Sequence, residues 1–278
     1  MSLDTPTAPA TANGVAGQLV YAIGDIHGCY DLLKELLAQV VADCQAWALG
    51  RRPVLVFLGD YVDRGPDSAK VLEALVWLRR RSEFEVHLLK GNHEQALLQF
   101  IQQPERAYGW LEYGGAATLD SYGVTPPMGQ ATAADYVAAR DALVERMPAS
   151  HLRLLETLEL MVVVGDYAFV HAGVRPGRPL RKQQEEDLLW IRQGFVDATG
   201  PFEKTIVHGH TWASDQPELW PHRLGLDTGA YATGVLTAAR LQDGRIGLLQ
   251  ARRPKPDAYV EPRPQDVWAM PTAEKTAS

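Results

Sequence analysis

The sequence predicts an α/β fold, leaning toward α+β, in which two β-sheets pack face to face with helices on the outside. Two observations indicate this architecture. In the first half, short apolar runs alternate with stretches whose apolar residues recur at helical spacing. In the second half, short apolar runs follow one another closely, and turns separate several of them. A chain of 278 residues is long enough to bury both sheets in one domain.

The first half alternates predicted strands with predicted helices. Residues 19–23, 54–58 and 86–89 are apolar runs of strand length. Leucines and valines at helical spacing predict helices over residues 32–41 and 71–78, and a third helix is expected from about 94 to 102. Asp67 or Ser68 is placed to cap the second helix. This β-α-β-α-β order favours a mostly parallel sheet.

The second half is expected to contribute a more antiparallel sheet. A helical stretch from about 133 to 158 precedes it and is interrupted at Pro148, because proline cannot continue a helix. The Gly165-Asp166 and Asp243-Gly244 pairs predict hairpin turns. The strands of this half are predicted over residues 160–164, 167–170, 205–207, 224–226, 235–241 and 246–249.

Charge and composition exclude several classes of protein. The chain has 27 Lys and Arg against 34 Asp and Glu, so it is a poor candidate for binding duplex nucleic acid. No apolar run approaches the roughly 20 residues of a membrane span, and the first 18 residues do not resemble a secretory signal. Cys29 and Cys44 form no disulfide framework, so we expect a cytoplasmic protein. No feature of the sequence indicates an oligomeric state.

Both ends of the chain differ in composition from the middle. Residues 1–18 are rich in Ala, Thr and Pro, which predicts a disordered tail. Residues 252–278 form a Pro-rich extension, which could lie on the body as an extended strap with Tyr259 and Trp268 as anchors. The folded domain is therefore expected over residues 19–251.

Polar side chains of the types that bind metals follow one predicted strand after another. The motifs are GDIHG at 24–28, GDYVDRG at 59–65, GNHE at 91–94, HAG at 171–173 and GHT at 209–211. In open α/β sheets, sites form in the crevice beyond the carboxyl ends of the strands. We therefore expect these five strand ends to converge on one site.

The candidate ligands in these motifs are imidazoles and oxygen donors, without a thiolate. Such a set suits Mn, Fe or Zn and is too rich in histidine for Ca or Mg alone. Six ligands exceed what one open catalytic site takes, and one carboxylate shared by two ions would divide them. The expected metal ligands are Asp25, His27, Asp60, Asn92, His171 and His210.

Four further residues have side chains suited to phosphate chemistry. A guanidinium matches a phosphate group bidentately, so Arg64 and Arg192 are candidate phosphate clamps. His93 stands beside a candidate ligand and could protonate a leaving oxygen. Asp63 could orient His93, since an acid–base group usually has a third group that orients it.

Taken in order, the five motifs resemble the calcineurin-like metallophosphoesterases, and within them the bacterial and phage serine/threonine phosphatases of the phosphoprotein phosphatase family. The resemblance spans about residues 22–230. It implies a four-layer αββα sandwich of two mixed sheets. Residues 114–123 and 147–158 resemble a bacterial branch, and a small helical insertion over about residues 104–158 is expected to cap the site. The end of the chain shows no clear match to the eukaryotic active-site tyrosine loop.

The resemblance also implies a role for each site residue. Asp25, His27 and Asp60 would hold one divalent ion, and Asp60, Asn92, His171 and His210 the second. Manganese is the expected metal, with iron or zinc as alternatives. A metal-bound hydroxide would attack phosphorus in line, with Arg64 and Arg192 clamping the phosphate. His93, paired with Asp63, would be the general acid.

The sequence leaves the substrate open between two classes. A phosphoserine or phosphothreonine protein phosphatase is favoured, because Asp63 and Glu94 stand where the symmetrical diadenosine tetraphosphatases usually carry alanine and aspartate. The alternative is such a dinucleoside polyphosphate hydrolase, which shares most of the motifs. A third hypothesis, a binding or scaffold protein without activity, is disfavoured because every candidate ligand, both arginines and His93 are present.

Overall fold

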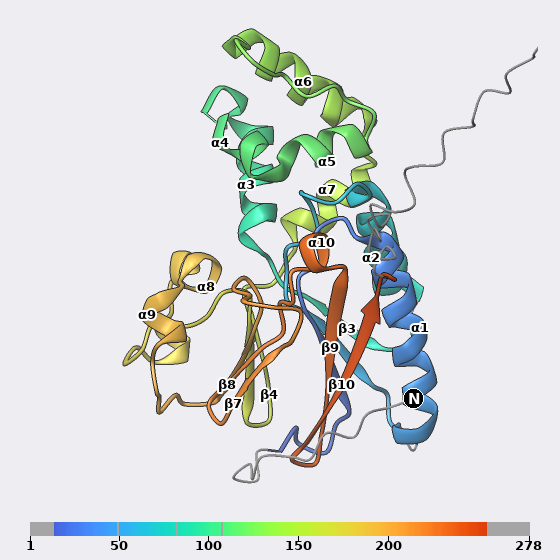
Figure 1. The fold of residues 1–278 in the computed structure, drawn as a ribbon, viewed down its shortest axis with the longest axis vertical. Helices are drawn as coiled ribbons and strands as arrows, with labels where there is room; N and C mark the ends of the chain where they lie inside the picture. The colour runs from blue at the N-terminus through green and yellow to red at the C-terminus, as the bar shows by residue number, and fades with distance from the viewer. Residues whose placement is uncertain (1–13, 49, 82, 107, 255–278) are drawn as a thin grey trace, which may run out of the picture.

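Two mixed five-stranded sheets form the centre of the molecule (Figure 1). The structure is a computed structural model and describes residues 14–48, 50–81, 83–106 and 108–254. The strand order is β10-β9-β1-β2-β3 in the first sheet and β4-β5-β6-β8-β7 in the second. The strands are β1 Val20–Ile23, β2 Val54–Phe57, β3 Glu85–Leu88, β4 Met161–Val164, β5 Tyr167–Val170, β6 Thr205–His208, β7 Glu218–Trp220, β8 Arg223–Gly225, β9 Val235–Gln242 and β10 Arg245–Arg252.

Strand β1 shows why the central strands are apolar throughout. Val20 and Ala22 point into the core between the two sheets, whereas Tyr21 and Ile23 point to the opposite face and pack against helices. Successive side chains of a strand alternate between faces, so a strand covered on both sides has no polar face. The same alternation holds in β2 and β5.

Helices complete a four-layer arrangement, which confirms the predicted fold class. Helices α1 and α2 cover the outer face of the first sheet, and α8 and α9 pack on the outer face of the second (Figure 1). The helices are α1 Tyr30–Trp47, α2 Ser68–Arg81, α3 Asn92–Gln102, α4 Tyr108–Trp110, α5 Ala116–Ser121, α6 Ala133–Arg146, α7 Ala149–Glu156, α8 Glu185–Trp190, α9 Gln193–Val196 and α10 Ala230–Thr233, with short helical turns at Pro104–Arg106, Leu111–Gly115 and Leu180–Lys182.

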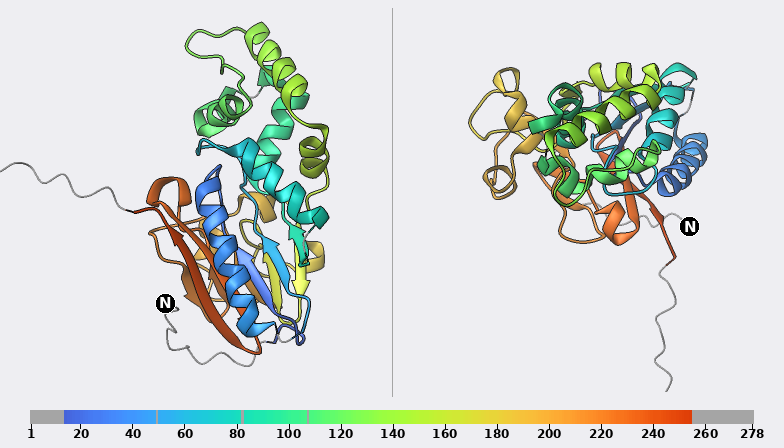
Figure 2. Two further views of the ribbon diagram at one scale, coloured as in Figure 1. Left: turned by 90° about the vertical axis from the view of Figure 1, so that its right-hand side faces the viewer. Right: turned by 90° about the horizontal axis from the view of Figure 1, so that it is seen from above.

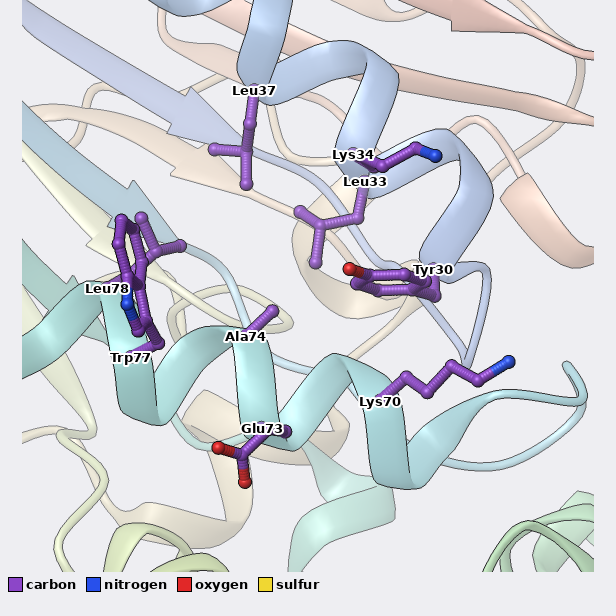
Figure 3. Close-up of a pocket in the computed structure, with 9 residues that line it drawn as sticks. All are labelled: Tyr30, Leu33, Lys34, Leu37, Lys70, Glu73, Ala74, Trp77 and Leu78. Atoms are coloured by element: carbon purple, nitrogen blue, oxygen red, sulfur yellow. The ribbon is translucent and has the colours of Figure 1, made fainter.

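A groove of about 440 Å³ separates α1 from α2. In Figure 3, Leu33 and Leu37 of α1 face Ala74 and Trp77 of α2 across it. Trp77 is 60% exposed although it lies beside apolar neighbours. None of the predicted site residues lines this groove.

The strand pairing differs from the prediction in the second half of the chain. The β9–β10 hairpin does not join the second sheet: β9 pairs antiparallel with β1, so the first sheet is mixed rather than mostly parallel. The second sheet in turn contains two parallel pairs, β5 with β6 and β6 with β8. The unpredicted strand β7 is a three-residue edge strand with little buried surface to mark it in sequence.

The insertion, residues 104–158, stands at the end of the molecule where the carboxyl ends of β1, β2 and β3 lie (Figures 1 and 2). Its helical stretch is interrupted where Pro148 predicts: α6 ends at Arg146 and α7 begins at Ala149. The unpredicted helices α4 and α5 are short segments joined through Gly114, whose φ is +114°.

The structure describes only part of the two predicted tails. Residues 14–18 do not form part of a disordered tail, because Val15 is buried in the core between the sheets and the Gly14 N–H donates to Asp166 at 3.0 Å. Residues 1–13 and the predicted anchors Tyr259 and Trp268 lie outside the described residues. Among the helices of the described segments, none combines the length and the apolar character that a membrane span requires.

Candidate metal centre

The predicted ligands come together where strands of both sheets end. Five loops, which we call the strand-end loops, carry them: residues 24–28 after β1, 59–65 after β2, 91–94 after β3, 171–173 after β5 and 208–211 at the end of β6. All six predicted ligands are buried. The convergence arises because β1, β2 and β3 run parallel in one sheet, as do β5 and β6 in the other.

Asp60 lies at the centre and faces two sets of histidines. Its Oδ2 is 3.5 Å from Nε2 of His27 and 3.9 Å from Nε2 of His93, and its Oδ1 is 3.4 Å from Nε2 of His171. Two groups of metal-donor atoms, each within 4.8 Å of one another, result: His27, Asp60 and His93, and Asp60, His171 and His210. Asp60 is therefore shared by the two groups, one oxygen toward each.

Backbone carbonyls fix the histidine tautomers. Nδ1 of His27 lies 2.9 Å from the carbonyl oxygen of Val62, and Nδ1 of His171 lies 2.8 Å from that of Leu58. A carbonyl only accepts, so each Nδ1 carries the hydrogen and each Nε2 presents its lone pair to Asp60. Burial lowers the pKa of His27 to about 3 and also lowers the pKa of His171, so both rings are neutral. Neutral imidazole is the form that binds metals.

Several of the candidate metal-ligand atoms have no hydrogen-bond partner, which leaves their lone pairs available to a cation. Oδ1 of Asp25 and Nε2 of His210 are buried and unpaired. Nε2 of His171 lies 2.9 Å from Oδ1 of Asn92, which brings two acceptors together. A buried acceptor without a partner is costly, and a divalent cation among these atoms removes that cost. The residues present thus fit the divalent ions that the donor types indicate.

His93 and Asp63 form a buried acid pair beside these donors. Nδ1 of His93 donates to Oδ2 of Asp63 at 2.6 Å, and Asp63 is completely buried. Burial lowers the pKa of His93, but the Asp60 and Asp63 carboxylates outweigh this effect and raise it above its ordinary value. The ring is thus held with Nδ1 on Asp63 and Nε2 directed at the centre, 3.9 Å from Oδ2 of Asp60.

The two predicted arginines differ in how they are held. The Arg64 guanidinium lies 4.6 Å from the ring centroid of Tyr231, and its backbone N–H donates to the Gly114 carbonyl at 3.1 Å. Arg192 is exposed and follows α8. Its positive charge nevertheless acts on His171 and His210, where it helps lower the pKa of both rings. The charge of Arg64 acts in the same way on His27, so each guanidinium influences a different histidine of the centre.

Backbone strain is concentrated in the strand-end loops. Among the described residues other than glycine, seven have positive φ, and five of them belong to the site: His27, Asp60, Asp63, Arg64 and His210. Each such conformation costs on the order of 1–3 kcal/mol and persists only where the surroundings impose it. The loops are therefore built for the placement of their side chains rather than for stability.

Sequence reasoning missed the residues that support these loops. The completely buried Glu94 accepts the N–H groups of Asp60, Tyr61 and Gly91 at 2.7–2.9 Å, and so ties the Asp60 loop to α3. Its position at the third residue of a helix that begins after Gly91, where a glutamate can accept the N–H of the residue before the helix, is the signal that could have found it. His208, at the end of β6, is buried and belongs to neither donor group.

Comparison with known proteins agrees with this geometry. The family model described as calcineurin-like phosphoesterase matches residues 19–228. The bis(5'-nucleosyl)-tetraphosphatase PrpE (asymmetrical) of Oceanobacillus iheyensis is 26% identical, over 84% of this chain and 92% of that protein. Serine/threonine-protein phosphatase 1 of Salmonella typhimurium is 29% identical, over 80% and 92%. The symmetrical bis(5'-nucleosyl)-tetraphosphatase of Aromatoleum aromaticum is 27% identical, over 82% and 95%.

These relatives carry two kinds of name, protein phosphatase and bis(5'-nucleosyl)-tetraphosphatase, whereas the family model names the broader group. The model covers most of the chain, from β1 to the loop after β8. Every strand-end loop, with its paired donor groups, lies inside the match. The chain therefore belongs to the calcineurin-like phosphoesterases and is a metal-dependent phosphoesterase.

Proposed function

We propose that this phosphoesterase removes phosphate from phosphoserine and phosphothreonine in proteins, in the cytoplasm. The single observation that carries the proposal is the buried Asp63–His93 pair beside the donor groups. A serine or threonine alkoxide is a poor leaving group and needs a proton as the P–O bond breaks. A phosphate leaving group, as in a dinucleoside tetraphosphate, needs that proton far less.

Two divalent ions, with manganese as the first choice and iron or zinc as alternatives, are proposed at the centre. Asp25, His27 and Asp60 would hold one ion, and Asp60 would share the other with Asn92, His171 and His210. Bound ions supply Lewis-acid activation of water and of the phosphoryl group. The unpaired buried acceptors and the fixed histidine tautomers support metal binding by these side chains.

The remaining steps use groups of the chain itself. Arg64 and Arg192 would bind the phosphoryl oxygens, which holds phosphorus in position for in-line displacement. His93 would give its Nε2 proton to the leaving oxygen. Its Nδ1 would keep its hydrogen, which is hydrogen-bonded to Asp63. The folded unit that performs this reaction is proposed to span residues 14–252, with residues 104–158 as its insertion.

A dinucleoside tetraphosphate is the second candidate substrate. Two of the relatives above are named as hydrolases of such compounds. One feature of the site also favours a nucleotide: Trp190 is 45% exposed, lies 6.5 Å from the His210 ring, and is held by Gln95, which accepts its indole N–H at 2.7 Å. An exposed and oriented indole at the rim of the centre is suited to stacking a base.

A direct comparison of substrates tests the proposal. Manganese-reconstituted protein would be given a phosphothreonine peptide and diadenosine tetraphosphate in parallel, with His93→Asn as the background control. We expect peptide turnover well above that control and little cleavage of the dinucleotide. The reverse result would contradict the protein phosphatase proposal, and a selective loss of dinucleotide cleavage in Trp190→Leu would then identify the stacking residue.

A further inference from the structure

The Asp63 carboxylate is held by the insertion as well as by His93. Besides the His93 hydrogen bond, Oδ2 accepts the indole N–H of Trp110 at 2.8 Å, and Oδ1 accepts the hydroxyl of Thr118 at 2.6 Å. Trp110 ends α4 and Thr118 lies in α5, both in the insertion. Thr118 is completely buried and Trp110 is 5% exposed. Three donors thus fix a completely buried carboxylate.

Thr118 holds the backbone of residue 63 too. Its hydroxyl oxygen accepts the Asp63 N–H at 2.9 Å while its hydrogen goes to the Asp63 carboxylate. Residue 63 has a φ of +72°, a conformation that needs support from its surroundings. Ser68 also accepts this N–H, at 3.1 Å. One threonine hydroxyl therefore sets both the conformation and the side-chain orientation of Asp63.

The neighbouring turn of the insertion fits closely against the next residue of the loop. The Gly114 carbonyl accepts the Arg64 N–H, and a β-carbon at Gly114 would lie 2.7 Å from Cγ of Arg64. A β-carbon at Gly115 would lie 2.4 Å from the Trp110 indole. Both glycines are thus needed for the stretch from Trp110 to Thr118 to reach residues 63 and 64.

We propose that Thr118 and Trp110 are positioning residues for proton donation by His93. They hold the Asp63 carboxylate in place, and Asp63 in turn holds His93 with Nε2 directed at the leaving oxygen. In the reaction, the Nε2 hydrogen goes to the leaving oxygen as the P–O bond breaks. His93 ends neutral. Its Nδ1 keeps its hydrogen, which remains hydrogen-bonded to Asp63, and Asp63 remains ionised. The inference rests on the proposed function of His93 as general acid, and it assigns the insertion a part in the reaction itself.

Two substrates whose leaving groups differ in their need for a proton distinguish this positioning role from a purely structural one. Phenyl phosphate releases a poor leaving group that depends on protonation, whereas p-nitrophenyl phosphate releases a stable anion that does not. A misdirected His93 therefore slows the first substrate and spares the second. Loss of fold or of bound metal would slow both alike.

The test uses full-length manganese-reconstituted protein and three variants of the two residues. Thr118→Val keeps the side-chain shape without the hydroxyl, and Trp110→Phe keeps an aromatic ring without the N–H. Thr118→Ser keeps the hydroxyl and is the matched control. In the first two variants we expect kcat on phenyl phosphate to fall on the order of 10²-fold, with p-nitrophenyl phosphate changed by less than about threefold, KM and metal content unchanged. Thr118→Ser should behave like the unmodified protein.

His93→Asn separates the inference from the proposed function. In that background Thr118→Val should add no further loss on phenyl phosphate, because both changes remove the same proton transfer. Equal losses on both substrates, or additive losses with His93→Asn, would overturn the positioning role while leaving the acid pair intact. If His93→Asn itself slowed both substrates equally, the general-acid assignment of the proposed function would fail instead.

Discussion

The strand-end loops and the insertion both reach the centre, but they hold side chains in different ways. In the strand-end loops, main-chain groups fix the metal donors: carbonyls hold the rings of His27 and His171. The insertion holds the Asp63 carboxylate through side chains, because Trp110 and Thr118 donate to it. Changes in the loops should therefore affect metal binding and fold together, whereas changes in the insertion should affect the chemical step with the donors in place.

Asp60→Asn should give the largest effect, because this carboxylate is shared by both donor groups. An amide keeps the shape but removes the charge and replaces one donor oxygen with NH₂. Turnover should fall by about 10³-fold or more, since several kcal/mol of Lewis-acid stabilisation depend on the site. Metal bound per chain, measured by mass spectrometry of the dialysed protein, should fall as well. Thr118→Val is the contrasting control from the insertion, and unchanged metal content in Asp60→Asn would contradict the shared position.

Glu94→Gln should show that the Asp60 loop depends on the hydrogen bonds that its backbone makes to Glu94. The carboxylate accepts several backbone N–H groups, and the glutamine NH₂ would face donors instead of accepting from them. Burying unsatisfied donors is costly, so the free energy of unfolding should fall by about 3 kcal/mol, measured by urea denaturation. Glu112→Gln, the same change at an exposed position, is the matched control. Unchanged stability in Glu94→Gln would mean that α3 does not hold the Asp60 loop.

The two regions also differ in how far sequence predicted them. The donors were predictable, because Asp, Asn and His directly after apolar strands are distinctive and their motifs are contiguous. Thr118 was not, because threonine is common in any helix and its partner Asp63 lies 55 positions away. A contact over that separation exists only once the insertion has folded against the loop, and no local pattern records it.

The sheet that each strand joins could not be predicted from local sequence either. The apolar runs that became β9 and β10 were predicted as strands, but they joined the first sheet instead of the second. Their alternation of side chains suits either sheet, and Ala239 and Leu241 of β9 still point into the core between the sheets. The choice of partner depends on β1, which lies more than 200 positions earlier.

The two arginines allow a finer comparison within the site. Arg64 is anchored by the insertion and packs on Tyr231, whereas Arg192 is exposed. An anchored guanidinium loses less freedom on binding phosphate, so Arg64→Ala should lower kcat/KM by about 10- to 100-fold and Arg192→Ala by about tenfold or less. Lysine at each position is the control that keeps the charge but lacks the planar guanidinium that binds phosphate bidentately. A larger loss at Arg192 than at Arg64 would show that anchoring does not decide their contributions.

An ion pair outside both regions should have the smallest effect. Arg253 donates to Asp31 in the first turn of α1, at 2.6 and 2.7 Å, and neither residue belongs to the strand-end loops or to the insertion. The pair is largely exposed, so Arg253→Gln should lower the free energy of unfolding by less than about 1 kcal/mol at neutral pH and leave turnover unchanged.

The pH dependence of that small effect has a definite sign. The hydrogen bond from Arg253 lowers the pKa of Asp31, so the folded state binds this proton less readily than the unfolded chain. The pair therefore contributes fully above the ordinary aspartate pKa of about 4, and its contribution is lost as the pH falls through the lower folded value. Urea denaturation of both proteins across this range should show their difference in stability shrinking toward acid. A difference that grew toward acid, or a loss of turnover at neutral pH, would mean that the first turn of α1 is coupled to the neighbouring His27 loop.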